Sequence, residues 1–185
     1  MNRYVYFWNP AADLSVRVHA WLCARREPPL FCVSDAPTLD KLADLLPEQG
    51  PLMGLSVKFR HILKPHHLAL FDQHVVNLHT SLLPWNRGAN PNVWPLVDGS
   101  PAGVSLHRMD AGLDTGPLLA QDLVPVVPGD TPQTLFTRLD NAAFRLFTDH
   151  WEYLLELPAH PQQGQGSYHR VSDLEDIEWK SLVAR

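Results

Sequence analysis

The sequence predicts one three-layer α/β domain built around a mainly parallel sheet. Short apolar runs rich in β-branched and aromatic residues alternate with longer segments whose apolar residues recur at helical spacing, which is typical of βαβ units. The sequence contains no internal repeat. Its length of 185 residues suits a single domain that buries roughly 70% of its unfolded surface. We therefore expect the strands to form one mainly parallel sheet within a single domain.

The first half of the chain alternates strand and helix signals. Asn9-Pro10 stops the first apolar run, and Pro28-Pro29 ends the helix that follows it. Ser34 or Asp35 is a suitable cap for a second helix. The expected strands lie at residues 3–8, 30–33 and 51–56, and the expected helices lie at residues 13–26, 34–46 and 64–71.

The second half continues this pattern but adds a long loop. Pro84, Gly88 and Pro91 interrupt residues 80–91, and long ordered loops are usually functional. Asp130-Thr131-Pro132 marks a helix start, because a capping residue precedes a proline near the first turn. The expected elements are strands at 75–78, 103–109 and 117–127, a short helix at 92–97, an acidic loop at 110–116 and a long helix at 133–157.

The C-terminal part is expected to pack on or near the domain formed by residues 1–157. Residues 158–166 are a polar linker rich in Pro, Gly and Gln, and residues 166–185 form a tail. The tail segment 168–170 could fold over a substrate or dock as a strand, and the sequence leaves both open. The apolar residues 124–127 and the tail could also form the edge of a homodimer, but residue spacing does not decide the oligomeric state.

Composition favours a cytoplasmic protein without nucleic-acid or membrane partners. Hydrophobic residues make up 45% and charged residues 19% of the chain, and the formal net charge is −5, so no basic footprint for nucleic acid is expected. Cys23 and Cys32 match no metal-ligand spacing, which predicts reduced thiols. No apolar segment approaches the roughly 20 residues of a membrane span, and residues 1–14 do not resemble a leader.

Asn77 and His79 are the first candidate catalytic residues. They follow two apolar residues near the end of an expected strand, and their spacing of two places them on one face. Ligands of open α/β sheets bind beyond the carboxyl ends of the strands. A histidine can move a proton near neutral pH, and an Asn amide can donate to an oxygen that becomes negative. The alternative is a structural histidine beside a turn-forming asparagine.

Asp114 is the third candidate, because it supplies a carboxylate in a loop flanked by Gly112 and Gly116. Near His79 it would raise the imidazole pKa and orient the ring. A metal site formed by His79, His107 and Asp114 is a disfavoured alternative. His107 could line the site or lie in the core. The histidines at 61, 66 and 67 are expected to be solvated.

Three motifs make the chain resemble the folate-dependent formyltransferases. They are NLHTSLLPWNRGANP, GVSLHRMDAGLDTGPLL and the step of twelve residues from Pro65 to Asn77. This family includes glycinamide ribonucleotide transformylase, methionyl-tRNA formyltransferase and sugar N-formyltransferases. The resemblance covers roughly residues 51–140 and implies a Rossmann-like formyltransferase domain. It also implies 10-formyltetrahydrofolate as the formyl donor, no metal, and a small-molecule amine as the acceptor.

The resemblance also implies roles for individual residues. Asn77, His79 and Asp114 match the catalytic triad of the family. A strip that holds the folate corresponds to Phe59, Arg60, His61, Ile62 and Leu63, and a loop that closes over it begins with Met109 and Asp110. The amine substrate would contact Trp85, Arg87, Asn90 and Asn92, although a loop of this composition could equally stabilise its own turns.

Departures from the family pattern narrow the expected acceptor. The first strand–helix loop, residues 8–12, has no glycine to cradle a phosphate, which disfavours a ribonucleotide substrate. The tRNA enzyme has basic surfaces and a further domain that are not evident in this acidic chain. The segment PWNRGANPNVW resembles more closely the loop of sugar N-formyltransferases and of formylation domains attached to peptide synthetases. This resemblance implies a nucleotide-linked amino sugar as the expected substrate. An amino acid or a carrier-bound aminoacyl group, hydrolysis of 10-formyltetrahydrofolate, and a non-catalytic folate-binding module are the alternatives.

Overall fold

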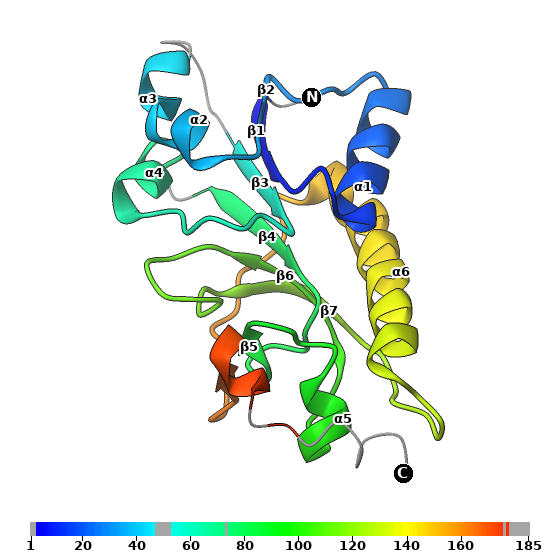
Figure 1. Cartoon of the computed structure of the whole chain (residues 1–185). Coiled ribbons are helices and arrows are strands. Elements are labelled where there is room, and N and C mark those ends of the chain that lie inside the picture. Colours follow the sequence, from blue (N-terminus) through cyan, green and yellow to red (C-terminus); the bar gives the residue numbers. More distant parts are fainter. Residues whose placement is uncertain (1–2, 47–52, 73, 176, 178–185) are drawn as a thin grey trace.

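The computed structural model describes residues 3–46, 53–72, 74–175 and 177, which form helices packed on both faces of a six-stranded sheet (Figure 1). This arrangement confirms the predicted three-layer α/β fold. No helix in the described part of the chain is both long enough and apolar enough to cross a membrane.

The main sheet has the strand order β2-β1-β3-β4-β6-β7. The first four strands are mutually parallel, whereas β6 is antiparallel to both of its neighbours. The sheet is therefore mainly parallel, as the sequence predicts, with one reversed strand. The strands are β1 (Tyr4–Trp8), β2 (Phe31–Val33), β3 (Met53–Val57), β4 (Val75–His79), β6 (Gly103–Arg108) and β7 (Leu118–Leu123).

Two apolar clusters hold the layers together. On one face, Leu14 and Leu22 of α1 (Asp13–Ala24) and Leu146 of α6 (Pro132–His150) pack against the sheet. The opposite face carries three short helices, α2 (Ala36–Asp40), α3 (Leu42–Leu45) and α4 (Pro65–Ala69), whose buried residues pack on Val5 and Phe7 (Figure 1). These short helices cover only part of their face (Figure 1).

A second, two-stranded sheet lies at the lower left of Figure 1, beside α5 (Trp94–Asp98). It pairs β5 (Arg87–Gly88) with β8 (Tyr168–His169) in parallel. A 3-10 helix at Val171–Leu174 follows β8. Residues 168–169 thus dock as a strand, which is one of the two possibilities that the sequence left open. Residues 176 and 178–185 of the expected tail lie outside the described residues.

Several element boundaries differ from the sequence prediction for physical reasons. The helix expected at 34–46 is split at Lys41 into α2 and α3. Leu45 at the end of α3 is 41% exposed, so α3 has no complete apolar face. The strand expected at 117–127 ends at Leu123, shortly before Pro125, which cannot donate to a sheet ladder.

The ends of two helices were also predicted too far along the chain. The helix α1 ends at Ala24 rather than at residue 26, and Arg26 has a left-handed φ of 61°. The helix α6 ends at His150 rather than at residue 157, and a 3-10 helix at Trp151–Tyr153 follows it. The first two residues of the strand expected at 51–56 lie outside the described residues.

One histidine was assigned to the wrong environment. His67 is 3% exposed rather than solvated, because its Nδ1 accepts the backbone N–H of Lys64 at 3.1 Å and thereby caps α4. His61 and His66 are exposed, as expected.

Candidate active site

The three candidate catalytic residues meet on the sheet face that carries α2, α3 and α4. Asn77 and His79 project from β4 itself rather than from a loop beyond it. Asp114 reaches them from the loop between β6 and β7. Its Oδ1 lies 3.4 Å from Nδ2 of Asn77, and its Oδ2 lies 3.6 Å from Nε2 of His79. The structure therefore brings Asp114 beside Asn77, which lies 37 residues earlier in the sequence, and beside His79 on the same strand.

The three side chains are largely shielded from solvent. Asn77 is 9% exposed, and the side chains of His79 and Asp114 are 12% and 10% exposed. Nε2 of His79 is buried and has no hydrogen-bond partner among the described residues. Its distance to Asp114 is too long for a hydrogen bond in the usual range. No hydrogen bond from the described residues therefore occupies this histidine nitrogen.

Asp114 is held in a strained backbone conformation by its surroundings. Its φ is 54°, which non-glycine residues rarely adopt. The backbone N–H of Gly88 donates to its Oδ2 at 2.9 Å. Burial alone would raise the pKa of the Asp114 carboxyl, but His79, His107 and the Gly88 N–H lower this pKa overall. The carboxylate is therefore ionised at neutral pH.

His107 is a fourth member of the cluster. It is 1% exposed, and its register on β6 places it directly opposite Asn77. Burial lowers the pKa of His107 to about 4, although Asp114 opposes this shift. The neutral ring donates from Nδ1 to the carbonyl of Arg108 at 2.9 Å, so Nε2 accepts from Nδ2 of Asn77 at 3.1 Å. His107 therefore lines the site and orients the Asn77 amide.

The residues assigned to the folate strip lie near one apolar cluster but differ in exposure. Phe59 and Met109 both pack against the cluster that includes Phe7 and Val75. Leu63 is a buried member of that cluster, whereas Ile62 is 71% exposed. Arg60 and His61 are exposed. Asp110 accepts the hydroxyl of Thr115 at 2.7 Å and the N–H of Gly112 at 3.0 Å, so it shapes the loop that carries Asp114.

The four residues assigned to the amine substrate do not converge on one point. The guanidinium of Arg87 donates to Oε1 of Gln162 at 2.6 Å. Nδ2 of Asn92 donates to the carbonyl of Pro132 at the start of α6 at 3.0 Å. Asn90 has a left-handed φ of 54°, and Trp85 is 38% exposed. As placed, Arg87 and Asn92 stabilise the loop rather than present free polar groups.

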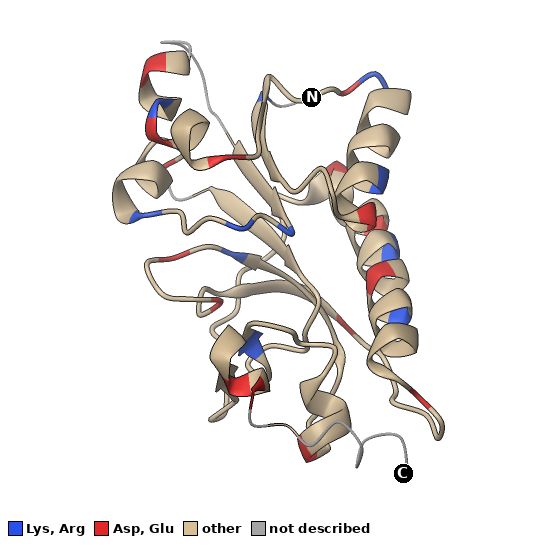
Figure 2. Ribbon diagram, viewed as in Figure 1, with Lys and Arg blue, Asp and Glu red and all other residues tan. Residues whose placement is uncertain are grey.

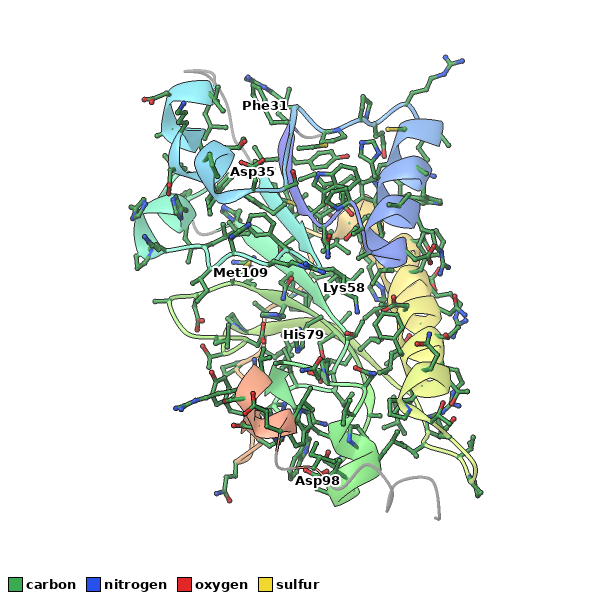
Figure 3. All side chains as sticks on the ribbon, viewed as in Figure 1. Phe31, Asp35, Lys58, His79, Asp98 and Met109 are labelled. Carbon is green, nitrogen blue, oxygen red and sulfur yellow. The ribbon has the colours of Figure 1, made fainter. Side chains whose placement is uncertain are left out.

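Lys58 and Gln162 are two residues that sequence reasoning missed. Lys58 directly follows β3 and lies near the labelled His79 (Figure 3). Its Nζ is 2.8 Å from Asp140 on α6 and donates to Thr80 at 3.0 Å. A polar residue just past a buried strand was the available signal for Lys58. Gln162 lies in the low-complexity linker and offered no such signal.

Lys and Arg are interleaved with Asp and Glu along α6, and basic residues follow β3 on the way to α4 (Figure 2). Within the described ranges, no group of three or more His, Cys, Asp or Glu side chains is arranged to hold a metal ion. The two histidine rings of the cluster, His79 and His107, have centroids 6.2 Å apart, and Nε2 of His107 is engaged by Asn77.

The chain is similar in sequence to known formyltransferases. A family model described as formyl transferase matches residues 33–150. GDP-perosamine N-formyltransferase from Brucella melitensis biotype 1 is 38% identical over 125 residues, which are 64% of this chain and 47% of that protein. Methionyl-tRNA formyltransferase from Thermus thermophilus is 35% identical over 126 residues, which are 68% of this chain and 41% of that protein. The chain thus spans about half or less of the length of these curated relatives.

A similar solved structure matches nearly the whole chain. It is the formyltransferase PseJ from Anoxybacillus kamchatkensis in complex with UDP-4,6-dideoxy-4-formamido-L-AltNAc and tetrahydrofolate. The TM-score is 0.78 at 28% identity, and the match covers 98% of this chain and 96% of that chain. The family model alone covers more than half of the sequence, and the chain therefore belongs to the formyl transferase family.

Proposed function

We propose that this protein transfers the formyl group of 10-formyltetrahydrofolate to a primary amine of a nucleotide-linked amino sugar. The observation that carries the proposal is the convergence of Asn77, His79 and Asp114, with Asp114 lying 3.4 Å from Asn77 and 3.6 Å from His79. Acyl transfer to an amine needs a group that moves protons, a group that orients it and a donor to the carbonyl oxygen. These three residues match those needs.

The proposed donor fits the residues beside this cluster. Phe59 and Met109 form an apolar edge, and Ile62 is 71% exposed although it is fully apolar. A flat heterocycle such as a pterin would remove this apolar surface from water. When bound, 10-formyltetrahydrofolate would supply a carbonyl carbon that an uncharged amine can attack.

The residues of the chain would then divide the work of acyl transfer. His79 would accept the proton that the amine nitrogen loses as the new C–N bond forms, and would return a proton to the departing folate nitrogen as the old bond breaks. Asp114 would stabilise the charged imidazole. Asn77 would donate to the carbonyl oxygen as it becomes negative. Because both hydrogens of its Nδ2 already have partners at 3.1 and 3.4 Å, Asn77 would release the longer bond, to Asp114, during this step.

A nucleotide-linked amino sugar is the proposed acceptor class. The Brucella relative is a GDP-perosamine N-formyltransferase, and PseJ was crystallised with a UDP-linked formamido sugar. The match to PseJ also extends over nearly the full length of both chains. The net charge of −5 supports a small-molecule acceptor over tRNA, because a tRNA-binding surface needs basic residues.

The test is formation of tetrahydrofolate from 10-formyltetrahydrofolate, followed by absorbance. Purified protein is assayed alone, with GDP-perosamine, with the 4-amino precursor of the sugar bound to PseJ, with free amino acids and with methionyl-tRNA. We expect turnover that depends on a sugar amine and is lost in Asp114→Asn. Turnover without any amine would identify a hydrolase, and turnover only with methionyl-tRNA or amino acids would overturn the proposed acceptor class.

A further inference from the structure

The side-chain amide of Gln162 makes four hydrogen bonds close to the candidate active site. Its Nε2 donates to the backbone carbonyls of Asp114 and Gly116, each at 2.8 Å. Its Oε1 accepts from Nε and Nη2 of Arg87 at 3.1 and 2.6 Å. All the hydrogen-bonding groups of this amide are therefore in use.

These bonds connect the two supports of the Asp114 carboxylate. One support is the Asp114 backbone, which adopts the left-handed φ of 54° and needs its surroundings to hold it there. The other is the Gly88 N–H, which donates to Oδ2 of Asp114 and belongs to the residue next to Arg87. Gln162 thus bonds through Nε2 to the backbone of Asp114, and through Oε1 to Arg87, the residue before Gly88.

Gln162 is itself fixed because it lies between two docked points of residues 158–174, which we name the C-terminal strap. Before Gln162, His160 exchanges two backbone hydrogen bonds with Leu118 of β7 at 2.8 and 2.9 Å. After it, β8 pairs with β5, where the N–H groups of Arg87 and Ala89 donate to Ser167 and His169 at 3.0 and 2.9 Å. The amide therefore needs little further ordering to reach Asp114.

Contacts between the strap and residues 86–94 specify this docking. Asn86 is fully buried, and its backbone N–H donates to the Ser167 hydroxyl at 2.8 Å, while the hydroxyl donates to Oδ1 of Asn86 at 3.1 Å. The ring of His169 stacks on Trp94 with centroids 3.8 Å apart. Gly88 has a φ of 87°, and a Cβ at this position would collide with the carbonyl of His169. The pairing of β5 with β8 therefore requires glycine at position 88.

We propose that Gln162 is a positioning residue that holds Asp114 in its working geometry. This inference rests on the proposed function, because it assumes that Asp114 orients His79 during formyl transfer. The strap then forms part of the active site rather than a linker. Loss of the Gln162 amide should leave the fold intact but release Asp114, and a displacement of about 1 Å at a catalytic group is enough to cost up to about a hundredfold in rate.

The test compares substitutions at Gln162 with the same substitutions at Gln163, which is exposed. Gln162→Glu keeps the size and the oxygen that faces Arg87, but turns a second oxygen toward the two carbonyls. Gln162→Met keeps the length and removes all hydrogen bonding. Gln163→Glu and Gln163→Met are the matched controls. Thermal unfolding establishes that each variant is folded.

The first readout is amide hydrogen exchange, which requires no substrate. Among the described residues the Gly88 N–H donates to the Asp114 carboxylate, whereas the Arg87 and Ala89 N–H groups report docking of the strap. In both Gln162 variants we expect exchange at Gly88 to accelerate at least tenfold while Arg87 and Ala89 stay protected. Unchanged protection at Gly88, or equal loss at all three amides, would overturn the positioning role, as would failure of both variants to fold.

The second readout is formyl transfer with GDP-perosamine and the UDP-linked 4-amino sugar as probes. We expect kcat to fall at least tenfold in both Gln162 variants with little change in KM, and we expect the Gln163 controls to match the wild type. A wild-type kcat in the Gln162 variants would overturn the inference. If Asp114→Asn also kept the wild-type rate, the proposed function itself would fail, and the exchange at Gly88 would still decide whether Gln162 positions Asp114.

Discussion

Nδ2 of Asn77 lies 3.1 Å from Nε2 of His107, so the two side chains are bonded directly across β4 and β6. The Nδ1 proton of His107 is taken by the Arg108 carbonyl, which leaves Nε2 as an acceptor. The bond therefore fixes the orientation of the Asn77 amide, with Nδ2 rather than Oδ1 facing His107. With one Nδ2 hydrogen held by His107, the second Nδ2 hydrogen faces Asp114 and is the one that can be offered to a ligand.

Replacement of His107 should disorder the Asn77 amide. His107→Phe keeps a ring of similar volume but leaves a buried Asn77 N–H without its acceptor, which costs about 1–3 kcal/mol of unfolding free energy. We expect a decrease in kcat of about tenfold or more, because the amide no longer points at the reacting oxygen. Steady-state kinetics and urea unfolding measure both effects. A variant with wild-type kcat would show that this bond does not serve catalysis.

The buried His107 should also make stability depend on pH. Its pKa is about 4 in the folded protein and 6.5 as the reference value, so between these values the unfolded chain binds a proton that the folded chain does not. The free energy of unfolding therefore decreases as pH falls through this window, by about 3 kcal/mol in all. Urea unfolding from about pH 7 to about pH 4.5 should show this decrease in the wild type and a smaller one in His107→Phe. Parallel curves for the two proteins would contradict a neutral His107.

The three central residues should be required for turnover but not for folding. Asn77→Ala removes a donor to the carbonyl oxygen and should lower kcat by about 10²–10³. His79→Ala removes the group that moves protons and should lower kcat by about 10²–10⁴. Asp114→Ala removes the charge beside His79 and should also abolish measurable transfer. Circular dichroism should report folded variants in each case, and wild-type rates in all three would refute the catalytic assignment.

Partly buried Lys58 and buried Asp140 form an ion pair that should be costly to break by removing the lysine charge. The side chain of Lys58 is 20% exposed and that of Asp140 is 5% exposed. Lys58→Met leaves the aspartate buried without its cation and should destabilise the fold by about 3 kcal/mol. Adding Asp140→Leu should restore most of that loss, because an apolar pair has no charge to desolvate. Chemical unfolding measures the stability of the single variant Lys58→Met and of the double variant. Equal stability of the single and double variants would be inconsistent with a coupled pair.

The fold was predictable from the sequence because its signals are local. Alternating apolar runs and helical segments indicate βαβ units, and the spacing of two between Asn77 and His79 places both on one face of β4. The loop glycines likewise marked Asp114 as a residue at a tight turn. Local patterns of this kind do not depend on distant parts of the chain.

The rest of the site depends on contacts between distant segments. Gln162 lies 48 residues from Asp114 in sequence, and nothing in its neighbourhood indicates which backbone it bonds. Arg87 and Asn92 are the types of residue that bind substrates, yet their partners are Gln162 and the start of α6. His67 read as a solvated histidine, because the capping bond to Lys64 appears only once the helix is formed. Only the three-dimensional structure separates these roles.

A single-turnover experiment tests formyl transfer to a sugar amine most directly. Enzyme in excess is mixed with 10-formyltetrahydrofolate and GDP-perosamine or the UDP-linked 4-amino sugar, and tetrahydrofolate and the formylated sugar are quantified by mass spectrometry. We predict that the two products appear together in equal amounts, and that Asp114→Asn forms neither at a comparable rate. Tetrahydrofolate released without a formylated sugar, or no reaction with either sugar amine, would contradict the proposed function.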